Sequence, residues 1–203
     1  MTTEYPQDLQ ESIKFHGHVC PGLLIGYRAA KAAKEHLGVD RPEDEELVAI
    51  VESDGCGVDA IQALLGCTLG KGNLIYQDHG KQVYTVICRK KGKAVRLAMR
   101  RGPFRRNPEQ EAVFQKVLKG EASKEEEETF RAFQKERVDE LLAADLNDLF
   151  KIEDVQPEIP SRARIFKSVT CEYCGEEVME PRARFRDGKI ACIPCSEHYN
   201  RGW

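Results

Sequence analysis

FHGHVCPGLLIGYRAAKAAKEHLG, residues 15–38, joins a short histidine- and cysteine-rich segment to a long helical pattern. Pro21 suits a first helical turn, and Gly38 can terminate the helix. Apolar residues recur on one face of the pattern, at Leu23, Tyr27, Ala30 and Leu37. The sequence therefore predicts a helix with one apolar face, preceded by a segment that carries potential metal ligands.

Strands and helices follow one another on either side of this segment. We expect a short helix over residues 8–14, a strand over 46–53, a turn and helix over 54–66, a strand over 73–77 and a β-hairpin over 81–101. From residue 108 to about residue 148 the pattern is helical in two segments, with a packing stripe of Phe130, Phe133, Leu141, Leu142 and Leu149. This order predicts an α+β fold with a mixed-sheet core flanked by helices.

The composition is that of a soluble globular protein, since 41% of the 203 residues are hydrophobic and 32% are charged. The N-terminal residues lack a basic region followed by an apolar run, and no stretch approaches the length of a bilayer. We therefore expect a cytoplasmic protein without a membrane contact. In that reducing compartment, eight cysteines indicate metal or thiol chemistry rather than disulfides.

The C-terminal part carries a strong zinc-site pattern. QPEIPSRAR, residues 156–164, is typical of a linker, so we expect a core domain over 1–156 and a linker with a finger over 157–203. The pairs CEYC and CIPC supply four thiolates for a structural zinc ion, namely Cys171, Cys174, Cys192 and Cys195. Between them we expect a hairpin with a turn at Asp187-Gly188, and after them a short helix, an order that resembles a treble-clef finger.

The finger and one basic run are the candidate contact surfaces. From Pro157 onward, eight Lys or Arg face seven Asp or Glu, a balance that favours a protein partner over nucleic acid. A second basic segment runs from Arg89 to Arg106, but no aromatic residues interleave with its charges to stack on bases. Because the net charge is −3, nucleic-acid binding would depend on such a local patch.

The opening segment predicts a second site in the core. If residues 16–20 are extended, His16, His18 and Cys20 project to the same side. Cys20 then lies at a helix start, where unpaired amides favour a thiolate that can bind metal or act as a nucleophile. Cys56 is likewise expected at a helix start, and Cys67 follows that helix in a glycine-rich loop as a weaker candidate. Taken singly, each of these residues is more often a packing residue than a ligand.

The motifs FHGHVCPG, SDGCGVDAIQALLGCTLGKGNL and DHGK, in this order, resemble the family of the E subunit of formylmethanofuran dehydrogenase, which is related to methanogenesis. The resemblance covers roughly residues 9–155 and implies an α+β core and an intertwined homodimer, with long helices exchanged between protomers. It places the family's histidine-cysteine motifs on His16, His18, Cys20, Cys56 and Cys67, and it implies an auxiliary treble-clef finger. The dehydrogenase reaction itself needs iron–sulfur clusters, and this chain has no ferredoxin-like cysteine ladder to hold them.

Three hypotheses follow. The leading one is a dimeric metal-binding accessory or regulatory protein with a structural zinc in the finger, used for partner contact, and a second transition metal at His16, His18, Cys20 and Cys56. The second is an enzyme that uses Cys20 as nucleophile or the core metal as Lewis acid. The third is a transcriptional regulator that binds nucleic acid through the finger and the basic run.

Overall fold

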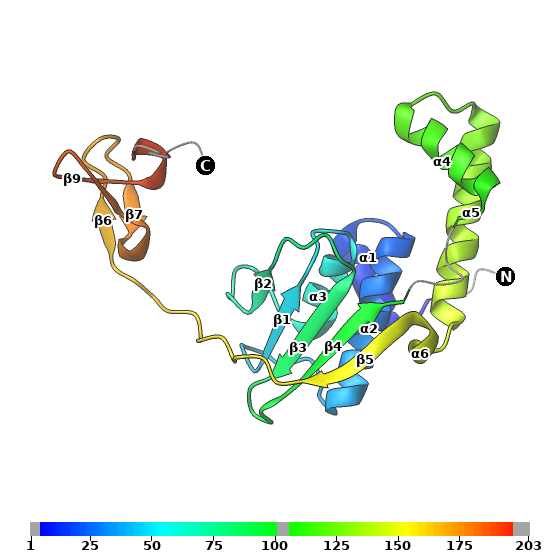
Figure 1. The fold of residues 1–203 in the computed structure, drawn as a ribbon, viewed down its shortest axis with the longest axis horizontal. Coiled ribbons are helices and arrows are strands. Elements are labelled where there is room, and N and C mark those ends of the chain that lie inside the picture. Colours follow the sequence, from blue (N-terminus) through cyan, green and yellow to red (C-terminus); the bar gives the residue numbers. More distant parts are fainter. Residues whose placement is uncertain (1–4, 101–105, 197–203) are drawn as a thin grey trace. The chain divides into compact units, whose positions relative to one another are not determined.

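The computed structural model describes residues 5–100 and 106–196. The chain divides into two compact units, Met1–Arg162 and Ala163–Trp203 (Figure 1). The division falls inside the predicted linker. Residues 160 and 161 remain with the first unit because the Arg89 guanidinium donates hydrogen bonds to the carbonyls of Pro160 and Ser161.

The first unit has a mixed sheet and six helices among the described residues. They are α1 (Gln7–His16), α2 (Pro21–Leu37), β1 (Leu47–Val51), α3 (Gly57–Leu65), β2 (Leu74–Tyr76), β3 (Val83–Cys88), β4 (Lys93–Met99), α4 (Pro108–Lys119), α5 (Lys124–Ala143), α6 (Leu146–Leu149) and β5 (Phe150–Val155). The sheet order is β2-β1-β3-β4-β5, in which only β1 and β2 run parallel. The predicted α+β class with a mixed sheet is confirmed. Among the described helices, none is long and apolar enough to cross a bilayer.

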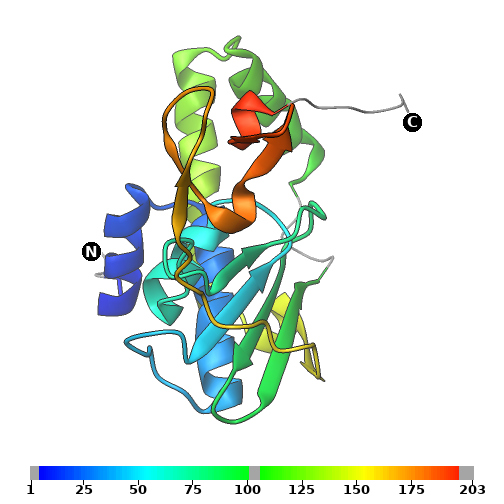
Figure 2. The same cartoon turned by 90° about the vertical axis from the view of Figure 1, so that its left-hand side faces the viewer.

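Helices α1, α2 and α3 lie on one side of the sheet, as the turned view shows (Figure 2). Alternate residues of β1 face them, because strand side chains point to opposite faces in turn. Leu47, Ala49 and Val51 thus join the main hydrophobic core with α2 and α3. On the other face, Val48, Ile87 and Ala94 form a smaller apolar cluster.

Helices α4 and α5 form a helical arm, residues 108–143, that extends beyond the sheet (Figure 1). The two predicted helical segments are confirmed, and capping boxes at Asn107 and Ser123 start them. The predicted stripe is divided. Leu141 and Leu149 are buried in the core, whereas Phe130 and Phe133 are only half-buried along the arm.

The second unit contains β6 (Ser168–Thr170), β7 (Glu177–Met179), β8 (Arg184–Arg186), β9 (Lys189–Ala191) and the short 3₁₀ turns Glu180–Arg182 and Ile193–Cys195. The Asp187-Gly188 turn is confirmed, because both residues have positive φ, at 48° and 77°. The single hairpin predicted between the cysteine pairs is wrong. Pro181 interrupts it with a 3₁₀ turn, so β6 pairs with β7 and β8 with β9. The helix predicted after Cys195 lies outside the described residues from residue 197 onward.

Candidate metal centres

His16, Cys20 and Cys56 come together in the core unit. One potential ligand atom from each lies within 4.8 Å of the other two. His16 is the last residue of α1, Cys20 is the N-cap of α2 and Cys56 is the N-cap of α3. Three helix ends therefore converge on one point and present an imidazole and two sulfurs, a donor set that suits zinc or another transition metal.

The predicted extended conformation of residues 16–20 is wrong. Helix α1 continues through His16, and Gly17 then turns the chain at φ 96°. This turn places Cys20 Sγ 3.8 Å from His16 Nε2 without the alternation of a strand. The ligand group does not include His18. The centroid of the His18 ring instead lies 4.5 Å from that of the His16 ring.

Glycines let the helices that carry the two cysteines approach each other. A Cβ atom at Gly26 of α2 would lie 2.0 Å from the carbonyl oxygen of Gly57, at the start of α3. At Gly57, a Cβ would lie 2.2 Å from the hydroxyl of Tyr84 in β3. Only residues without a side chain fit at this crossing, and their contact holds Cys20 and Cys56 near each other.

Asp59 orients the histidine. Its Oδ2 accepts a hydrogen bond of 2.6 Å from His16 Nδ1, which leaves Nε2 facing Cys20. Gln62 Nε2 donates to the other carboxylate oxygen of Asp59 over 3.3 Å. Histidines that bind metals commonly donate their second N–H to a carboxylate in this way. The sequence analysis missed Asp59, although its place three residues after Cys56 on the predicted helix was a usable signal.

The pKa of the Cys20 thiol is raised. Burial is the main cause, and the neighbouring Cys56 adds to it, whereas the amide of Leu23 acts in the opposite direction over 3.4 Å. The predicted helix-start contact is therefore present, but the raised pKa contradicts the predicted preference for a thiolate. A bound cation would supply the positive charge that a thiolate needs here.

The remaining core cysteines do not join this group. Cys67 is buried, and its thiol points to the carbonyl of Leu65 at 3.8 Å. Burial raises its pKa to about 12. Cys88 is buried in β3, as a packing residue would be. Among the core cysteines, the structure thus brings only Cys20 and Cys56 to the ligand group.

A cavity of about 460 Å³ adjoins the core group. His16, Cys56 and Asp59 line it, together with the apolar side chains of Val51, Val58 and Leu74. Small-molecule sites typically have volumes of about 300–1,000 Å³ and mostly apolar walls. The core group is therefore accessible to a small molecule.

The four finger cysteines form the second group, with ligand atoms within 4.8 Å of one another. The amide of Cys192 donates a hydrogen bond of 3.2 Å to Cys171 Sγ. The amides of Cys174 and Cys192 lower the pKa of Cys171 to about 6, which favours the thiolate. Four thiolates in this arrangement fit a closed, structural zinc site.

The basic run is largely used inside the core unit. Its side chains donate to protein acceptors, from Arg89 to Glu45 and Pro160, from Lys91 to Leu37 and Gly38, from Arg96 to Glu52, and from Arg100 to Asn147 and Phe150. Arg101 and Arg105 lie outside the described residues. These contacts assign the described part of the run a structural role.

Two family models match the chain. Residues 15–151 match the family described as FmdE, molybdenum formylmethanofuran dehydrogenase operon, and residues 164–201 match the prokaryotic dksA/traR C4-type zinc finger. A curated relative from Archaeoglobus fulgidus, named a probable S-adenosyl-L-methionine-binding protein, is 36% identical over 193 residues. That match covers 92% of this chain but 51% of the relative, so the chain spans about half the relative's length.

A solved structure has the same fold. It is a tungsten formylmethanofuran dehydrogenase FmdE-like protein from Syntrophus aciditrophicus, with a TM-score of 0.56 and 23% sequence identity. The match covers 92% of this chain and 89% of that one. At this identity the similarity concerns the fold.

Proposed function

The chain belongs to the FmdE family over residues 15–151, and on that premise we propose that it is a metal-binding accessory or regulatory protein with a core His/Cys site. The observation that carries the proposal is the convergence of His16, Cys20 and Cys56 within 4.8 Å. The carboxylate of Asp59, fixed on His16, supports it as an orienting group.

The donor set indicates the kind of metal. One imidazole and two thiolates suit zinc, and the same atoms also bind other soft or borderline transition metals. Three protein ligands leave a fourth tetrahedral position for water or another molecule, as in catalytic rather than structural zinc sites. Both cysteine groups need reduced thiols, which supports a cytoplasmic location.

Metal analysis of purified protein tests the proposal. Wild-type protein should carry metal at both groups, Cys20→Ser should lose only the core metal, and Cys171→Ser should lose only the finger metal. Cys88→Ala is the control, because Cys88 belongs to neither group. Metal that disappears only in the Cys171→Ser variant, with none lost from Cys20→Ser, would contradict the core site.

We further propose that the finger contacts a protein partner. Its side chains include Phe185, which is 83% exposed, and Met179, which is 52% exposed. Exposed apolar residues of this size are typical of protein contact surfaces. Cross-linking in cell extract should yield a specific partner that is lost with Phe185→Ser but kept with Glu177→Gln, and equal products from both variants would contradict this role.

The homodimer implied by the family resemblance is proposed to form through the helical arm. None of the residues of α4 is buried, and Leu118 on it is 63% exposed. Light scattering should give a dimer for the wild type and a monomer for Leu118→Asp. Ile159→Asp, at another exposed apolar residue outside the arm, should remain dimeric. A monomeric wild type would contradict the proposal.

Metal-dependent catalysis is a second candidate function, favoured by the cavity beside the core group. A bound ion would act there as a Lewis acid. Catalysis by Cys20 as a free nucleophile is less favoured, because burial raises the pKa of its thiol. The rate of Cys20 alkylation against pH separates the two, since a free nucleophile would react fully below pH 8.

A further inference from the structure

The mouth of the cavity beside the core group carries negative charge. Its lining includes the carboxylates of Asp54 and Asp59 but no lysine or arginine. Asp54 is exposed, and no ion pair of it occurs among the described residues. The cavity therefore repels anions and attracts cations.

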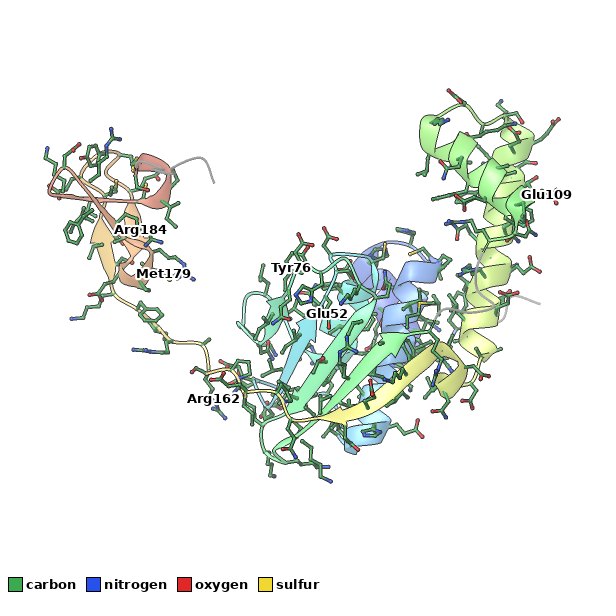
Figure 3. All side chains as sticks on the ribbon, in the orientation of Figure 1. Glu52, Tyr76, Glu109, Arg162, Met179 and Arg184 are labelled. Carbon is green, nitrogen blue, oxygen red and sulfur yellow. The ribbon has the colours of Figure 1, made fainter. Side chains whose placement is uncertain are left out.

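An aromatic ring stands beside these carboxylates. Tyr76, the last residue of β2, lines the cavity and is 47% exposed. Figure 3 labels it next to Glu52, which directly follows β1. A hydrogen bond to Asp78 and the charge of Asp54 raise the pKa of its phenol, so both carboxylates lie close to the ring. An aromatic face flanked by carboxylates is a common arrangement for binding organic ammonium groups.

An orphaned hydroxyl gives an independent indication of a ligand. Ser53 lines the cavity, is only 9% exposed, and its Oγ has no hydrogen-bond partner among the described protein atoms. A buried hydroxyl without a partner is destabilising, by about 1–3 kcal/mol in mutational data. A polar group of a bound molecule would satisfy it.

We propose that this cavity binds a small organic ammonium compound that has apolar substituents and a hydroxyl or similar polar group. The ammonium group lies at Tyr76 and Asp54, the apolar part contacts Val51, Val58 and Leu74, and the polar group reaches inward to Ser53. This inference rests on the proposed function, because the inner wall is formed by His16 and Cys56 of the core metal site.

A pair of isosteric probes tests the charge requirement. Choline carries a trimethylammonium group, and 3,3-dimethylbutan-1-ol has the same shape with a neutral carbon in place of nitrogen. Calorimetric or NMR titration of the metal-loaded full chain should give saturable binding of choline that is at least roughly fivefold tighter than binding of the alcohol. Equal or tighter binding of the alcohol, or no saturable binding of choline, would overturn the proposal.

Exposed residues provide the variants, so loss of binding is not confused with loss of the fold. Asp54→Asn and Tyr76→Leu should each weaken choline binding by roughly three- to tenfold and leave binding of the alcohol unchanged. Asp40→Asn removes the same charge from an exposed residue that does not line the cavity, and it should have no effect. An equal loss in all three variants would overturn the assignment to this cavity.

Metal analysis of the same preparations separates this inference from the proposed function. Protein that lacks a core metal but still prefers choline would contradict the proposed function and leave cation recognition supported. Protein that holds the core metal but shows no preference for choline would leave the proposed function intact and refute the inference.

Discussion

Two histidines that lie two residues apart have different surroundings. His16 faces Cys20 with Nε2 and is held by Asp59 through Nδ1, whereas His18 lies outside the ligand group. We expect His16→Ala to lose the core metal and His18→Ala to retain it, as measured by metal content after gel filtration. Loss of the core metal in both variants, with the fold intact by circular dichroism, would mean that His18 is also a ligand.

Glu52 is a second residue with a defined electrostatic role. It is buried and accepts hydrogen bonds from His79 over 3.1 Å and from Arg96 over 3.2 Å. Burial favours the neutral acid, but these two partners outweigh it and hold the pKa of Glu52 below its ordinary value of 4.5. The ionised carboxylate therefore stabilises the fold above the unfolded-state pKa, and this contribution is lost as the pH falls through the lower folded-state pKa.

The corresponding prediction concerns stability against pH. Glu52→Gln should lower the free energy of unfolding by about 1–2 kcal/mol at pH 7. The difference from wild type should shrink as the pH falls below about 4, as measured by urea unfolding. Glu128→Gln, at an exposed glutamate of α5, is the control. A Glu52→Gln difference that stays constant down to pH 3 would contradict the ionic role.

The sequence was most informative where a single residue has a local signature. The N-cap positions of Cys20 and Cys56 followed from the helix patterns that begin after them. The separate fates of His16 and His18 did not, because they depend on where α1 ends. The raised pKa of Cys20 also could not be predicted, since burial is a property of the packed core rather than of neighbouring residues.

At the scale of elements, the crossing of α2 and α3 depends on the absence of side chains. In an ordinary helix interior, Gly→Ala stabilises by about 1 kcal/mol. At Gly26 the added methyl would lie 2.0 Å from the backbone of Gly57, so overpacking should reverse the sign. We expect Gly26→Ala to destabilise the core by about 1–3 kcal/mol in urea unfolding and to weaken binding of the core metal.

Gly70→Ala is the matched control, because a methyl group there would have no neighbour within 4 Å. It should leave both stability and metal content close to wild type. Gly26→Ala protein as stable as wild type would mean that the two helices can separate without cost, and that their contact does not position the cysteines.

Most elements were predictable because their periodicity is strong. Strands β1 to β4 and helices α2 to α5 all lie close to their expected ranges. The finger hairpin was not, since a proline within a short alternating pattern breaks pairing in a way that alternation alone does not reveal. The pairing of β4 with β5 also requires the fold, because the whole helical arm separates these strands in the chain.

At the scale of the molecule, the two units depend on different sources of stability. The first has a large apolar core, whereas the buried apolar side chains described in the second are Cys171, Ala191 and Cys192. A unit with so little buried apolar surface depends on its metal, whose binding contributes about 10–16 kcal/mol in zinc-finger peptides.

Removal of metal should therefore affect the units separately. We expect a strong chelator to collapse the NMR amide dispersion of residues 168–195 while the dispersion of the sheet residues persists. Cys171→Ser should reproduce the same pattern without chelator. Finger signals that stay dispersed after complete metal removal would show that this unit folds on its own apolar contacts.

The strand order also affects how copies of the chain behave at high concentration. It leaves β2 and β5 as the two edges, each with unpaired backbone groups that could template intermolecular aggregation. Strand β2 has only three residues, and β5 carries Lys151 and Glu153, paired over 2.8 Å, followed by Asp154. A short edge and a charged edge both discourage a further strand from joining, so the sheet stays finite in a crowded solution.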